Sequence, residues 1–177
     1  MLTIGYLSSL GLSADGSFTQ ATLAAALVLA MRDRGGQMPA GLALHSPWLD
    51  LTLGTGAMDS AYLTADLTIA PAFMASTLVP MYVGDSHSPS EAAISPLKCE
   101  DVGDLCPQLV TWGSAEVLQC DAREWAKRCH AAGVEVETYV GHGGLHCFCL
   151  GGLASSKALE REGDKVFIRW IAKHLQV

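Results

Sequence analysis

Charged residues are scarce in this sequence: they make up 16% of its 177 residues, and aromatic residues only 7%. The formal net charge is −7 and no basic stripe is present, so we expect no nucleic-acid partner, which would need a cationic surface. No apolar run reaches the length of a membrane span. The longest candidate, residues 21–31, is followed directly by Arg32, and we therefore expect no transmembrane segment.

Signals for export and for metal binding are also missing. The N-terminus has no basic region before an apolar core, so we expect no secretory signal and a cytoplasmic protein. The six cysteines do not form paired C-x-x-C hooks, so a zinc site is not expected. Cys147 and Cys149 form a single C-x-C beside a histidine, where metal binding or redox chemistry is the alternative to reduced, packed thiols.

Hydrophobic residues are abundant, at 50%, and the length predicts one domain with a sizeable core. Apolar runs of strand and helix type alternate along the chain, which predicts an α/β fold with a parallel sheet and helices on both faces. The predicted strands span residues 41–45, 108–113 and 134–140. Helices are predicted over residues 19–34, 67–82, 119–132 and 155–175, and prolines 71 and 80 are expected to interrupt the second of these.

A glycine-rich stretch, residues 141–148, follows the last predicted strand and carries His146. Its three glycines permit a sharp turn and a close backbone approach, and Phe148 can anchor the histidine. Glu116 follows the strand over residues 108–113 in the same way. Reactive groups of open α/β sheets gather beyond the carboxyl ends of strands, so this order indicates the second half of a nucleophile–acid–histidine triad. The alternatives are a loop histidine without a catalytic task and a solvated loop carboxylate.

Five short stretches, taken together in order and spacing, resemble one known family. They span residues 32–35, 46–51, 95–97, 113–118 and 144–148. Residues 21–177 are similar to the C-terminal part of an esterase of the hormone-sensitive-lipase family of α/β-hydrolases. The resemblance implies a partial α/β-hydrolase fold with its N-terminal strands missing, hydrolysis of small carboxylic esters, and no metal or organic cofactor. It makes His146 the triad base and Glu116 the triad acid, where the family usually has aspartate, with Asp121 as the fallback.

Residues 1–20 depart from the family pattern and are expected to form an atypical N-terminal segment before the domain over residues 21–177. No His-Gly-Gly oxyanion segment is present, and an ungapped count back from Arg32 places Phe18 where the nucleophilic serine belongs. Ser13, in a glycine-flanked stretch, is the remaining candidate nucleophile. We hypothesise that residues 1–20 do not descend from the family and are encoded by intronic sequence.

These departures lead to two expectations about activity. As an esterase, the chain is expected to be impaired, because the oxyanion hole that stabilises the transition state is not recognisable. As the alternative, the chain is a non-catalytic truncated remnant. Such a remnant would form a homodimer, or bind another partner, through an exposed edge of its sheet.

Overall fold

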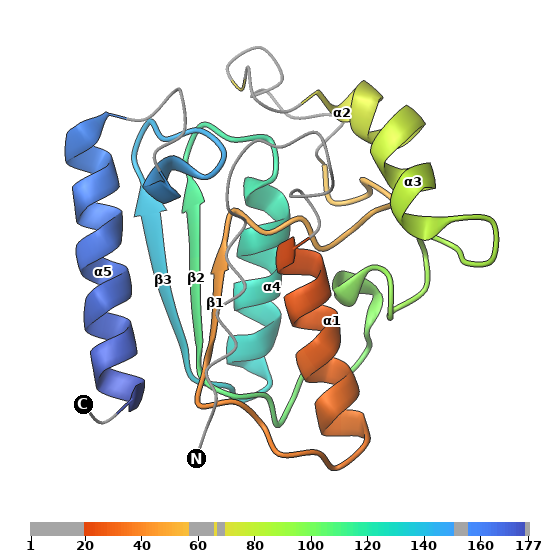
Figure 1. Cartoon of the computed structure of the whole chain (residues 1–177), viewed down its shortest axis with the longest axis horizontal. Helices are drawn as coiled ribbons and strands as arrows, with labels where there is room; N and C mark the ends of the chain where they lie inside the picture. Colours follow the sequence, from red (N-terminus) through yellow and green to blue (C-terminus); the bar gives the residue numbers. More distant parts are fainter. Residues whose placement is uncertain (1–19, 57–65, 67–69, 151–155, 176–177) are drawn as a thin grey trace.

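The computed structural model describes residues 20–56, 66, 70–150 and 156–175. Helices and strands alternate along these residues, as the sequence predicts (Figure 1). The strands are β1 (Leu42–His45), β2 (Gln108–Gly113) and β3 (Val136–Gly141). The α-helices are α1 (Gln20–Asp33), α2 (Pro71–Phe73), α3 (Val79–Val83), α4 (Gln119–Ala131) and α5 (Lys157–Leu175); a π-helical turn spans Met74–Leu78, and 3-10 turns span Pro96–Lys98 and Phe148–Leu150.

The sheet is parallel throughout, in the order β1-β2-β3. Its register pairs Leu42 with Gln108, and Gln108 in turn with Val136. Every residue of the central strand, β2, is buried. The predicted parallel sheet is therefore confirmed, and the carboxyl ends of all three strands lie at one edge of it, which is the edge at the top of Figure 1.

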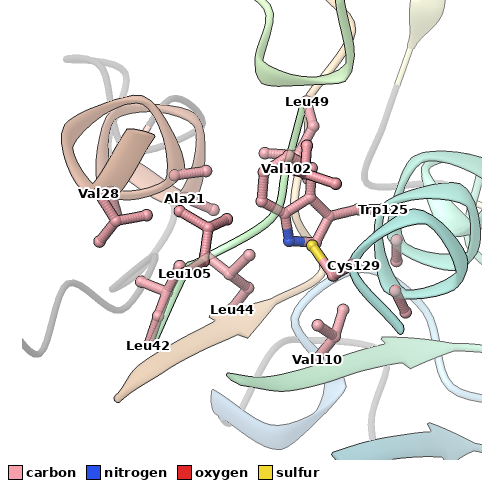
Figure 2. Close-up of a cluster of buried hydrophobic side chains, with 14 of the residues drawn as sticks. Ala21, Val28, Leu42, Leu44, Leu49, Val102, Leu105, Val110, Trp125 and Cys129 are labelled. Atoms are coloured by element: carbon pink, nitrogen blue, oxygen red, sulfur yellow. The ribbon is translucent and has the colours of Figure 1, made fainter. Parts of the chain in front are cut away.

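Helices cover both faces of the sheet. On one face α1 and α4 pack against it, and on the other face lies α5 (Figure 1). Figure 2 shows the core between α1, α4 and the sheet, where Val28, Leu44, Val110 and Trp125 meet. The Trp125 ring is fully buried, and its Nε1 donates a hydrogen bond to Oε1 of Gln108 at 2.7 Å. The one polar atom of the indole is therefore hydrogen-bonded although the ring is buried.

The helix α5 packs on the opposite face through one apolar stripe. Val166 and Trp170, four residues apart and so on one side of the helix, are buried against Leu109 of β2. The contact is close at the start of β1, because a Cβ atom on Gly41 would lie 2.4 Å from the Trp170 ring. A glycine at this position therefore lets the indole reach the sheet.

The irregular segment over residues 71–83 differs in part from its prediction. Pro71 and Pro80 were expected to interrupt a helix, yet the helical path is continuous from Pro71 to Val83. Each proline lies in the first turn of a helix, where a missing N–H is tolerated, and a π-helical turn precedes Pro80. The expected interruption at Pro80 is therefore a local change of helix type.

The end of α1 follows its sequence signal. Gly35 has φ +63°, and the N–H groups of Gly35 and Gly36 donate to the carbonyls of Arg32 and Met31. This glycine C-cap ends α1 within a residue of the end predicted for the helix over residues 19–34. In the segments that the structure describes, none of the helices is long and apolar enough to cross a bilayer.

Candidate active site

Three polar side chains follow the three strands at the same edge of the sheet. Ser46 comes directly after β1, Glu116 lies in the turn after β2, and His146 lies in the loop after β3. The strands end in register, with His45 beside Thr111 and Gly113 beside Gly141. The fold thus brings three loops, which are up to 100 positions apart in the chain, to one edge of the sheet (Figure 1).

Glu116 is completely buried. The hydrogen bonds that the structure describes for its carboxyl group involve only one of the two oxygens, Oε2. Oε2 accepts a hydrogen bond from the Ser46 hydroxyl at 2.6 Å and one from the Gly113 N–H at 3.2 Å. Among the residues that the structure describes, none donates a hydrogen bond to Oε1. Burial raises the pKa of Glu116 to about 8, and these two donors oppose the rise. The carboxylates of Asp66 and Asp121 raise it further by repulsion.

His146 is partly exposed as a residue, but its Nδ1 atom is buried. Burial lowers the pKa of His146 to about 4, and the nearby Asp66 carboxylate opposes this shift. The imidazole is therefore neutral at pH 7, which is the form that can accept a proton. The backbone N–H of the next residue, Cys147, donates to Oγ of Ser46 at 2.9 Å. Through Ser46, the loop of His146 is thereby connected to the Glu116 carboxylate.

The loops after β2 and β3 are joined by further hydrogen bonds. The N–H groups of Ser114 and Ala115 donate to the carbonyls of Gly141 and Gly144, at 2.9 and 3.0 Å. In return, the Gly143 N–H donates to Oγ of Ser114 at 2.8 Å. These bonds hold the two loops together in one relative position.

The glycines of the last loop permit its close packing. A Cβ atom on Gly141 would lie 2.7 Å from the Phe148 ring, and one on Gly144 would lie 3.0 Å from the Cβ of Phe148. The Phe148 side chain is fully buried. The prediction that Phe148 anchors the loop of His146 agrees with this packing.

Asp121, the fallback acid, has a different set of partners. Its Oδ2 accepts the backbone N–H groups of Leu49 and Asp50 at 2.7 and 2.8 Å, and its Oδ1 accepts the Thr55 hydroxyl. Burial raises its pKa to about 6, which these donors oppose. The carboxylate thus anchors the segment that follows β1, which favours Glu116 over Asp121 as the acid.

Two further polar residues, Asp66 and Ser46, lie at this edge and were not predicted from the sequence. Asp66 is buried, and its Oδ2 accepts the Val117 N–H at 3.0 Å. It comes from a segment without a clear period, so no pattern pointed to it. Ser46 could have been found, because it follows a predicted strand as directly as Glu116 follows another.

Cys147 and Cys149 do not share one environment. Cys149 is buried, with its Sγ 3.2 Å from Nδ1 of His45, and that nitrogen lies 2.6 Å from Oγ1 of Thr111. Burial raises the pKa of Cys149 to about 12 and lowers that of His45 to about 4, so both are neutral at pH 7. Within the described ranges, no three His, Cys, Asp or Glu side chains are grouped so that they could hold a metal ion.

A groove of about 770 Å³ lies elsewhere on the molecule. It runs along α4 and β3, and its lining includes Trp112, Arg123, Lys127 and His130. Neither Glu116 nor His146 lines it. The candidate site is therefore defined by the convergent polar groups at the carboxyl edge of the sheet, and this groove is separate from it. The candidate nucleophile, Ser13, lies outside the described residues.

Comparison with known proteins agrees with this topology. A family model described as alpha/beta hydrolase fold matches residues 19–150, so the chain belongs to the alpha/beta hydrolase fold family. A protein named esterase from Acinetobacter venetianus is 34% identical over 122 residues, which are 69% of this chain and 39% of that protein.

Two solved structures extend the likeness. One, a hormone-sensitive lipase from a metagenome library, aligns with a TM-score of 0.77 and 29% identity over 88% of this chain and 52% of its own. The other, an esterase of the bacterial hormone-sensitive lipase family, aligns with a TM-score of 0.71 and 27% identity over 83% and 49%. The resemblance to the C-terminal portion of such esterases is thus confirmed. The chain spans about two fifths to one half of the length of these relatives.

Proposed function

We propose that this chain provides the acid and the base of a carboxylic-ester hydrolase. The observation that carries the proposal is that a buried glutamate and a neutral histidine follow two adjacent strands at the same carboxyl edge of a parallel sheet. The likeness to proteins named as esterases supports the same class of reaction. Small carboxylic esters are the proposed substrates.

In the proposed reaction a serine hydroxyl attacks the ester carbonyl and gives its proton to His146. The imidazolium then protonates the departing alcohol, which leaves an acyl-serine. Water, deprotonated by His146, attacks this intermediate and releases the acid and the serine. Glu116 orients the imidazole and stabilises its positive charge. Because the pKa of Glu116 is about 8, the imidazolium would also favour the ionised form of this buried carboxyl.

The test uses the purified 177-residue chain and a short-chain p-nitrophenyl ester. We expect His146→Ala and Glu116→Gln to abolish hydrolysis. His142→Ala is the matched control, because His142 is an exposed histidine of the same loop and its loss should leave the rate unchanged. A folded parent without activity, or equal activity in all three variants, would contradict the proposal.

The nucleophile can be located without assuming which serine it is. A fluorophosphonate probe reacts with activated serines, and mass spectrometry identifies the labelled peptide. Labelling at Ser13, lost in Ser13→Ala and in His146→Ala, is the expected result. Absence of labelling in a folded sample would favour the alternative of a non-catalytic remnant.

The location and assembly of the protein belong to the same proposal. The free state of all six cysteines supports a reducing compartment such as the cytoplasm.

A homodimer is proposed on the ground that β1 and β3 are the outer strands of the three-stranded sheet. Sedimentation equilibrium tests this: a monomer mass at all concentrations would contradict the dimer.

A further inference from the structure

Ser46 occupies an unusual backbone position at the end of β1. Its φ is +48°, in the left-handed region that residues with a side chain rarely adopt. The ladder to β2 nevertheless continues through it, because its N–H donates to the Thr111 carbonyl at 2.7 Å. The side chain is buried, with 3% of the residue exposed. The surrounding structure therefore holds Ser46 in a conformation that points its hydroxyl at buried partners.

The hydroxyl of Ser46 joins two loops, and its hydrogen-bond direction is fixed. The Cys147 N–H can only donate, so Oγ of Ser46 accepts that bond at 2.9 Å. The single hydroxyl proton is then available for Oε2 of Glu116, 2.6 Å away. One serine thus connects the acid after β2 with the loop after β3 that carries His146.

The two oxygens of Glu116 are treated differently by their surroundings. Ser46 and the Gly113 N–H both donate to Oε2, which fixes the rotation of the carboxyl group. Oε1 is buried and receives no hydrogen bond from the residues that the structure describes. Two donors on one oxygen therefore leave the other oxygen for a further N–H, such as the ring of a catalytic imidazole.

We propose that Ser46 is a positioning residue: its hydroxyl fixes the Glu116 carboxyl and ties it to the loop of His146, so that acid and base keep one relative placement. The inference rests on the proposed function for the roles of Glu116 and His146. It goes beyond it by assigning a task to Ser46, which is neither the acid, nor the base, nor the candidate nucleophile.

The charges around Glu116 make this hydroxyl electrostatically important. The titratable groups that raise the pKa of Glu116 are the carboxyls of Asp66 and Asp121. The Cys149 thiol also interacts with Glu116, but it is neutral at pH 7. Against the two carboxyls and against burial stand two donors, Ser46 and the Gly113 amide. Removal of the Ser46 hydroxyl should therefore raise the pKa of Glu116 above its value of about 8.

The experiment measures the titration of Glu116 directly, by NMR of the full chain labelled with 13C-glutamate. Glu116→Gln assigns the signal. Two variants remove the hydroxyl: Ser46→Ala keeps the backbone strain, and Ser46→Gly relieves it because glycine adopts positive φ readily. In both we expect the pKa of Glu116 to rise by about one pH unit or more, with a change in the His146 ring shifts.

Ser95→Ala is the matched control. Ser95 is also a fully buried serine that joins two segments, because its Oγ accepts the Leu51 N–H at 2.8 Å and donates to the Pro89 carbonyl at 2.6 Å. Its loss should lower stability but leave the pKa of Glu116 at about 8. This contrast separates positioning from a general structural role.

Three results would overturn the proposal. One is an unchanged pKa of Glu116 in the folded Ser46 variants, and another is an equal rise in Ser95→Ala. The third is failure of both Ser46 variants to fold while Ser95→Ala folds, because Ser46 would then serve the fold alone. None of these measurements uses ester hydrolysis, so failure of the proposed function, seen in the His146→Ala assay, is a distinct outcome.

Discussion

Gly113 at the end of β2 packs directly against the backbone of Gly144 in the loop of His146. A Cβ atom on Gly113 would lie 2.1 Å from the carbonyl oxygen of Gly144, a distance that no folded structure tolerates. The two loops of the candidate site are therefore held together by a contact that only glycine permits, beside the hydrogen bonds that join them.

Gly113→Ala is accordingly expected to destabilise the protein by about 3 kcal/mol or more, because the added methyl group must push backbone apart. Urea unfolding at pH 7 measures this. Gly103→Ala is the control, since its Cβ would lie 3.2 Å from Oδ1 of Asp101, the end of an exposed side chain that can move. We expect it to cost less than about 1 kcal/mol. Equal losses in the two variants would contradict the close-contact argument.

The main architecture could be predicted from the sequence because its signals are local. Residues 108–113 contain Val110, Thr111 and Trp112, which favour strands, and the structure has β2 over the same residues. Gly35 marks the end of α1, as expected. Helix type around Pro80 could not be predicted, since a π-helical turn depends on how its neighbours pack and not on a period in the sequence.

The candidate site was predictable only in part, because the sequence indicates only those site residues that directly follow a predicted strand. Glu116 and His146 were found because each follows a strand. Asp66 could not be found in this way, because it enters the site from a segment without a clear period. The bridge through Ser46 joins residues 70 and 101 positions apart, and such long-range pairing is set by the register of the sheet.

Glu116 makes the stability of the protein depend on pH in a defined direction. Its pKa is about 8 in the folded protein and 4.5 for an ordinary glutamate. The unfolded chain therefore ionises first, and the contribution of Glu116 to stability is lost as the pH rises from about 4.5 to about 8. Glu116→Gln cannot ionise, so its stability relative to the parent should improve across this window by on the order of 4 kcal/mol.

Chemical denaturation at several pH values between 4.5 and 8.5 tests this dependence. Glu162→Gln is the control, because it removes a carboxylate that lies on the surface of α5 and should leave the slope of the parent unchanged. A constant stability difference between Glu116→Gln and the parent over the whole range would mean that Glu116 has the same pKa in the folded and the unfolded protein. That result would contradict the prediction.

Asp121 is expected to matter for stability through the segment after β1. In Asp121→Ala the buried N–H groups of Leu49 and Asp50 lose their acceptor, which should cost about 3 kcal/mol. Asp101→Ala is the matched control, since that exposed carboxylate accepts the single N–H of Gly103, and we expect a loss below about 1 kcal/mol. Thermal unfolding followed by circular dichroism compares the two; similar midpoints would contradict the anchoring role.

His45 is expected to make the protein sensitive to acid. Burial beside Thr111 and Cys149 lowers its pKa to about 4, against 6.5 for an ordinary histidine. Because the unfolded chain takes up the proton first, this contribution to stability is present above pH 6.5 and is lost as the pH falls toward 4. His45→Gln should remove the dependence, by on the order of 3 kcal/mol across the window, whatever its effect at neutral pH.

The measurement for His45 is the stability difference between variant and parent at each pH from 4 to 7.5. Taking the difference cancels the contributions of Glu116 and of His146, which are present in both proteins. His142→Gln, at an exposed histidine of the loop after β3, serves as the control, and its stability difference from the parent should stay constant. If the stability difference between His45→Gln and the parent is also constant over this range, the imidazole of His45 must become charged within the folded protein at its ordinary pKa. The neutral thiol–imidazole pair with Cys149 would then be wrong.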